Sequence, residues 1–138
     1  MAEMKTERAQ RLESANSFLR RAKEQYDEAA VDSWEPKQPA DCVTNCFYSY
    51  GNAISAAAAA VGLNIPNNHY DKAKLARLLF KQEHVSTDIH DLLLELNELR
   101  KNVSYGEPGP ELSEANLEDL LADLEHYLED VEKLLATE

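Results

Sequence analysis

Apolar residues recur along this chain at steps of three and four, the spacing that places side chains on one face of an α-helix. This pattern predicts five helices, over about residues 3–30, 41–62, 70–82, 87–103 and 114–136. No stretch alternates apolar and polar residues with the period of two that is typical of a half-buried β-strand. The sequence therefore predicts an all-α protein.

The ends of these helices are marked by residues that start or stop helices. Gly62 suits a helix C-terminus, and Asn68 suits the N-cap of the helix that follows. Prolines and glycines in "DSWEPKQPA" and "GEPGPEL" end the first and the fourth helix. Four long amphipathic helices and one short helix, joined by short connections, pack best as an up-and-down bundle. We expect residues 1–138 to form a single domain of this kind.

Charge is distributed unevenly along the chain. The formal net charge is -12, and residues 106–138 hold eleven acids against the single base Lys133. The preceding part is therefore close to neutral. An acidic protein is a poor general binder of nucleic acid, because Lys and Arg supply most of the non-specific affinity for phosphates. A local basic groove in the near-neutral part is still compatible with the sequence, and so is a high-salt source of the protein.

Cysteines, histidines and apolar runs exclude several kinds of site. Cys42 and Cys46 lie four residues apart, too far along a helix for an unstrained disulfide, so we expect two buried thiols in a reducing compartment. The histidines show no spacing typical of a metal site, and no cofactor-binding motif is present. No apolar run reaches the length of a membrane-spanning helix. We therefore expect a cytoplasmic protein without metal, cofactor or membrane contact.

The stretch "ELRKNVSYGEPG" carries the strongest candidate chemistry. The predicted fourth helix ends in Arg100, and Asn102 and Tyr105 follow just before Gly106. A helix end needs neither an arginine nor a tyrosine for purely structural reasons. A structural interpretation still exists: a cation near the negative end of a helix stabilises it by roughly 0.3–1 kcal/mol. In that interpretation Tyr105 packs against the end of the helix.

A long first helix is followed by an aromatic and alanine-rich second helix, "CFYSYGNAISAAAAAVGL", and by a histidine-bearing loop and helix, "NIPNNHYDKAKLARLL". A leucine-rich helix that ends in Arg100 and a long last helix come next. In this order of segments, nearly the whole chain resembles the HEPN (higher eukaryotes and prokaryotes nucleotide-binding) domain superfamily. The resemblance implies a homodimer, frequent in toxin–antitoxin and defence systems and sometimes encoded beside a nucleotidyltransferase-like antitoxin. Active members resemble one another in an arginine, four to six intervening residues and a histidine, which form a metal-independent RNA-cleaving site.

Carried over residue by residue, this motif is incomplete here. Arg100 matches the arginine of the motif, Lys101 and Asn102 follow it, and Tyr105 stands where the histidine would be. An imidazole transfers protons near neutral pH, whereas a phenol with a pKa of about 10 does not without a large shift. The resemblance therefore implies an RNA- or nucleotide-binding site at Arg100, Lys101 and Asn102. Arg100 and Tyr105 stand at its catalytic positions, and we expect no strong RNA cleavage by the protein alone.

A second class of function is compatible with the same sequence. The acidic last helix would suit a non-enzymatic, dimeric interaction protein that binds a basic partner. In that case we expect Arg100 to pair with an acid, whereas a phosphate site requires that it face a cleft. We interpret His69 as a capping or surface residue, His90 as partly exposed, and Trp34 as a plug at one end of the bundle.

Overall fold

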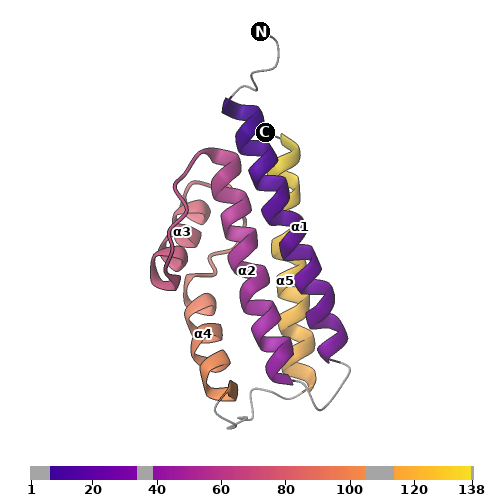
Figure 1. Cartoon of the computed structure of the whole chain (residues 1–138). Helices are drawn as coiled ribbons and strands as arrows, with labels where there is room; N and C mark the ends of the chain where they lie inside the picture. Colours follow the sequence, from indigo (N-terminus) through magenta and orange to yellow (C-terminus); the bar gives the residue numbers. More distant parts are fainter. Residues whose placement is uncertain (1–6, 34–38, 105–113, 138) are drawn as a thin grey trace.

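The computed structural model describes residues 7–33, 39–104 and 114–137, and these form five α-helices without a strand (Figure 1). This result confirms the predicted all-α bundle. The helices are α1 (Glu7–Ser33), α2 (Pro39–Val61), α3 (His69–Lys81), α4 (His90–Ser104) and α5 (Glu114–Thr137).

Helix α2 lies at the centre of the bundle and contacts each of the other four helices. The long helices α1 and α5 run along one side of it, while the shorter α3 and α4 follow one another along the other side (Figure 1). The sequence of α2 explains this central position. Its alanine run, Ala56 to Ala60, is almost fully buried, and small side chains allow neighbouring helices to approach closely.

Small side chains also line the contact between α1 and α2. Ala15, Ala22 and Ala29 of α1 are fully buried, as the predicted spacing requires. One buried polar group joins the two helices, because the Ser49 hydroxyl donates a hydrogen bond of 2.6 Å to the backbone carbonyl of Ala22. Buried hydroxyls need such partners, so this bond fixes the register of α2 on α1.

Helix α3 differs from the prediction in one buried position. We expect Leu75, Leu78 and Leu79 to face inward, but Leu78 is 40% exposed. The helix instead buries a face that includes Ala73, Ala76, Leu75 and Leu79, and Leu78 lies outside that face. Asn68 caps the helix as predicted, since its side-chain oxygen accepts a hydrogen bond from the backbone N–H of Asp71. Gly62 has a φ of +79° at the end of α2, which confirms it as a glycine-type helix terminus.

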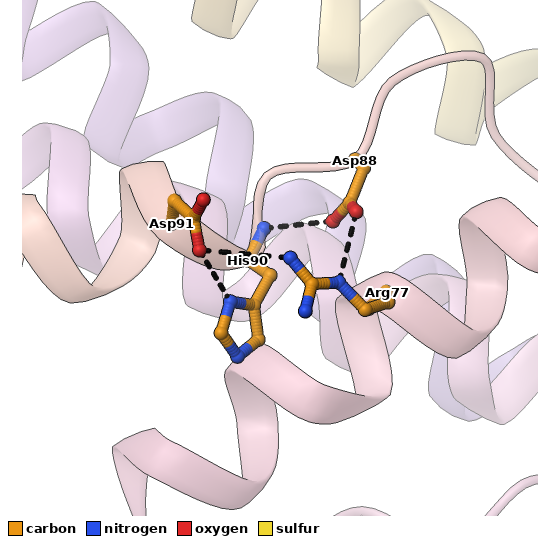
Figure 2. Close-up of polar contacts among 4 residues, drawn as sticks. All are labelled: Arg77, Asp88, His90 and Asp91. Carbon is orange, nitrogen blue, oxygen red and sulfur yellow. Dashed lines mark hydrogen bonds and ion pairs between the residues drawn. The ribbon is translucent and has the colours of Figure 1, made fainter.

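The connection from α3 to α4 explains why α4 begins at His90 and not near Thr87 (Figure 2). The Asp88 carboxylate accepts hydrogen bonds of 3.0 Å from the backbone N–H of His90 and from Nε of Arg77 on α3. Arg77 also contacts Asp91 at 3.6 Å. Partial burial works to raise the pKa of Asp88, but these two hydrogen bonds hold it below its usual value. Asp88 thus starts α4 and ties it to α3.

Two further predictions concern thiols and membranes. Cys42 and Cys46 are both buried, as expected, and they form no disulfide. Among the residues that the structure describes, no helix is long and apolar enough to cross a membrane, and no group of side chains is arranged to hold a metal ion.

Candidate functional site

Arg100 lies in the last turn but one of α4 and is held by a neighbour on the same helix. Its Nη2 donates a hydrogen bond of 2.8 Å to Oδ1 of Asn97. Asn97 is polar but only 3% exposed, because it lies on the side of α4 that packs against the bundle. It precedes Arg100 by three residues, a spacing at which side chains on a helix are neighbours. A buried amide therefore sets the direction of the guanidinium.

Two aromatic rings of α2 flank the same guanidinium. The guanidinium carbon of Arg100 lies 5.0 Å from the ring centre of Phe47 and 5.7 Å from that of Tyr48. Both distances are in the range of a cation–π contact. Phe47 is buried, whereas Tyr48 is 42% exposed. One ring thus supports the arginine from the core, and the other presents part of its surface to solvent.

His69, the first residue of α3, shares the Phe47 ring with Arg100. Its imidazole packs edge-on against Phe47 with 4.8 Å between the ring centres. Partial burial lowers the pKa of His69, and the positive charges of Arg100, Lys72 and Lys101 lower it further. Three cations therefore act on one imidazole, which favours its neutral form.

Lys72 brings a further positive charge to this place. Its side chain runs past Gly51 of α2, where an added Cβ would lie 3.8 Å from Lys72 Nζ. Partial burial lowers the pKa of its ammonium group. Together with Phe47, Tyr48 and His69, Gly51 and Lys72 line a small pocket of about 70 Å³.

We call this group of residues the Arg100 site: Arg100, Lys101, Asn97, His69, Lys72, Phe47 and Tyr48. Such a site can bind an anion, because arginine offers a planar fork of donors and lysine offers a compact charge. The exposed part of Tyr48 can in addition stack on a flat ring, as aromatic side chains do with unpaired bases. Phosphate and base are the two parts of a nucleotide.

The comparison with protein families agrees with this chemistry, since the HEPN domain model matches residues 12–134. The chain belongs to the HEPN domain family. HEPN domains are associated with RNA binding and ribonuclease activity in toxin–antitoxin and defence systems. A search of curated proteins and a search of solved structures found no match.

The structure tests only part of the motif expected for a HEPN domain. It brings Arg100 and Lys101 together with His69, and Lys101 also contacts Glu98 at 3.7 Å. The side chain of Asn102 and the whole of Tyr105 lie outside the described residues, as does Trp34. The replacement of the motif histidine by Tyr105 therefore stays a prediction.

Sequence reasoning missed the residues that other helices contribute. His69 is not the cap of α3, which is Asn68, and it is partly buried against Phe47. His90 is partly exposed, as expected. Nothing in the sequence marks Lys72 as a site residue, because a lysine in the first turns of a short helix is ordinary. The sequence does mark Asn97, which is a polar residue four positions after the buried Leu93, on the apolar side of α4.

Proposed function

We propose that this HEPN domain binds RNA or nucleotides at the Arg100 site. The observation that carries the proposal is the convergence of cations from two helices on the imidazole of His69, with Arg100 and Lys101 from α4 and Lys72 from α3. They meet beside Phe47 and Tyr48, although the protein as a whole is strongly acidic. An arginine that only stabilises a helix end does not require neighbouring cations and aromatic rings.

The proposed contacts follow from the residue types. Arg100 and Lys72 donate to phosphate oxygens, Lys101 adds charge at the entrance, and Tyr48 stacks on a base. Asn102 belongs to the proposed site by its place in the sequence. Phosphate binding would also favour protonation of His69, because a dianion nearby offsets the repulsion from the three cations.

The family supports a wider proposal on partners. We propose that residues 1–138 act as one domain, that the protein is a homodimer, and that it forms the toxin-like part of a toxin–antitoxin or defence system. A nucleotidyltransferase-like protein is the proposed antitoxin. HEPN domains commonly dimerise and pair with such partners.

Binding to a labelled single-stranded RNA oligonucleotide tests the proposal. We expect Arg100→Gln to weaken binding about tenfold or more, because hydrogen bonds to charged groups contribute roughly 1.5–3 kcal/mol. The dependence of affinity on salt should become shallower, by about 0.7 in the logarithmic slope. Arg20→Gln is the matched control, since Arg20 is exposed on α1 and lies outside the site. If both variants lost the same RNA affinity, the loss would be explained by net charge alone, and the proposal would be overturned.

The same experiment separates binding from cleavage. We expect the RNA to remain largely intact in the presence of a chelator, since Tyr105 stands at the position of the motif histidine. Metal-independent cleavage that is lost in both Arg100→Gln and His69→Gln would contradict this expectation and assign the proton transfer to His69. Absence of RNA and nucleotide binding would favour the alternative function, an interaction protein that uses the acidic α5.

A further inference from the structure

A second pocket, of about 420 Å³, lies between the connection from α3 to α4 and the part of α5 from Asp123 to Lys133. It shares no lining residue with the pocket at the Arg100 site. Its wall consists of Tyr50 of α2, residues around Asp88 at the start of α4, and one side of α5 from Asp123 to Lys133. This wall differs from the Arg100 site in charge, and the pocket is larger.

Two buried tyrosines form part of the wall. Tyr50 is 1% exposed and Tyr127 is 2% exposed, and their rings pack edge to face with 5.6 Å between centres. Neither hydroxyl oxygen has a hydrogen-bond partner within the described part of the chain. Burial raises the pKa of both phenols, so both stay protonated and neutral. Buried polar groups are almost always paired, so two unpaired hydroxyls on residues that line the same pocket favour a polar ligand there.

The charged groups of the pocket determine the sign of that ligand. Four carboxylates line it, against one lysine and one histidine; they are Asp88, Asp123, Glu129 and Asp130, with Lys133 and His126. Asp88 is held by Arg77 (Figure 2), and Asp130 accepts hydrogen bonds from the backbone and the hydroxyl of Ser86. Asp123 has no such partner in the described residues. An anion would be repelled here, and a cation attracted.

The volume of the pocket and its apolar residues indicate what kind of cation fits. A volume of about 420 Å³ is far larger than one metal ion needs. Ile89 and Leu92 add apolar surface beside the acids. A ligand that matches both has ammonium groups separated by methylene segments. A terminal ammonium offers three N–H donors, an internal one offers two, and neither has an acceptor, which suits carboxylates and phenol oxygens.

We propose that this pocket binds a linear aliphatic polyamine. One ammonium group donates to the hydroxyls of Tyr50 and Tyr127 and a second donates to Asp123, while the methylene chain contacts Ile89 and Leu92. This binding does not depend on the proposed RNA-binding function, because the two sites share no residue. In this proposal the acidic face of α5 binds a specific ligand and does not only attract basic partners in general.

Calorimetric titration of the full-length protein with spermidine at physiological salt tests the proposal. We expect saturable binding of one spermidine per chain, weakened about fivefold or more by Asp123→Asn. Asp119→Asn is the matched control, because Asp119 is an exposed acid on the same helix that does not line the pocket. It should change the affinity less than twofold. The control removes the same charge, so it separates the pocket from diffuse attraction.

Tyr127→Phe gives a second test that does not depend on charge. Its melting temperature without spermidine should be unchanged or higher, since the substitution removes a buried unpaired hydroxyl and keeps the ring. The rise in melting temperature on adding spermidine should be smaller than in the wild-type protein. The proposal is overturned if no saturable binding occurs, if Asp119→Asn weakens binding as much as Asp123→Asn, or if Tyr127→Phe binds spermidine as the wild-type protein does.

Discussion

At the scale of single residues, Asn97 is the side chain that orients Arg100. The buried amide oxygen of Asn97 accepts a hydrogen bond from the guanidinium of Arg100, which restricts the rotamers of this long side chain before any ligand is present. Ordering a flexible side chain on binding costs about 0.5–1.5 kcal/mol of free energy. Because Asn97 already orders Arg100 in the free protein, part of this cost does not arise on binding. Asn97 is thus a positioning residue in the proposed site, and the proposed phosphate contact is made by Arg100.

Asn97→Leu tests this role, since leucine has a similar volume and no acceptor. We expect RNA affinity to fall about two- to tenfold, which corresponds to the ordering of one side chain. The double variant Asn97→Leu with Arg100→Gln should bind no more weakly than Arg100→Gln alone, because Asn97 acts through Arg100. Additive losses would show that Asn97 contributes independently, and a melting curve of each variant checks that the fold is kept.

The Arg100 site could be predicted from the sequence only in part, for a reason visible in its residues. Arg100 and Lys101 are neighbours on one helix, so a short motif contains both. His69 and Lys72 come from α3, about thirty residues earlier, and only the packing of α3 and α4 on α2 brings them to Arg100. Phe47 and Tyr48 read as ordinary aromatic positions of α2 until the arginine is placed above them.

At the scale of helices, Gly51 within α2 and Gly62 at its end have opposite roles. Gly62 has a φ of +79° and allows the backbone N–H of Leu63 to reach the carbonyl of Ala58 at 2.9 Å. Gly51 lies within α2, where an added Cβ would meet only the Lys72 side chain, at the ordinary contact distance of 3.8 Å. Glycine is therefore required at one of these positions and only tolerated at the other.

Urea unfolding of two alanine variants measures this difference. Gly62→Ala should lower the free energy of unfolding by about 1 kcal/mol, because a side chain is strained in the left-handed region. Gly51→Ala should raise it by up to about 1 kcal/mol, because alanine is the better helix former. Stabilisation by Gly62→Ala, or a loss in Gly51→Ala as large as that in Gly62→Ala, would contradict this account of α2.

The helices themselves could be predicted well because their apolar spacing is regular. The buried residues of α1, α2 and α5 recur at the steps of three and four that the sequence shows. The start of α4 was predicted three residues too early. Asp88 accepts one hydrogen bond from the nearby backbone N–H of His90 and one from Arg77 on α3, and the second of these is a tertiary contact that the local sequence pattern does not contain. The inward place assigned to Leu78 was wrong because α3 is short and buries a face rich in alanine.

At the scale of the whole molecule, positive and negative charge are separated. Acids gather on α5, which carries eleven acids and one base together with its flanking residues, while the Arg100 site concentrates cations at α3 and α4. Such a separation directs a polyanion toward one face and away from the other. It also implies that RNA binding weakens steeply as salt is added.

We expect the protein to be a homodimer, as its membership of the HEPN family suggests. Large apolar side chains remain exposed on α3, where Tyr70 is 60% and Phe80 39% exposed, and association would cover surface of this kind. Sedimentation velocity at micromolar concentration should give a mass twice that of the 15.6 kDa chain. A species of one chain at that concentration would contradict the expectation.

The central claim is that RNA phosphate lies among Arg100, Lys72 and His69, and an NMR titration of the His69 ring tests it most directly. In the free protein, burial and neighbouring cations hold the His69 pKa below its usual value of about 6.5. A bound phosphate should raise the His69 pKa, so RNA affinity should also increase as the pH falls through that range. A His69 pKa that stays unchanged while RNA is bound would contradict the claim.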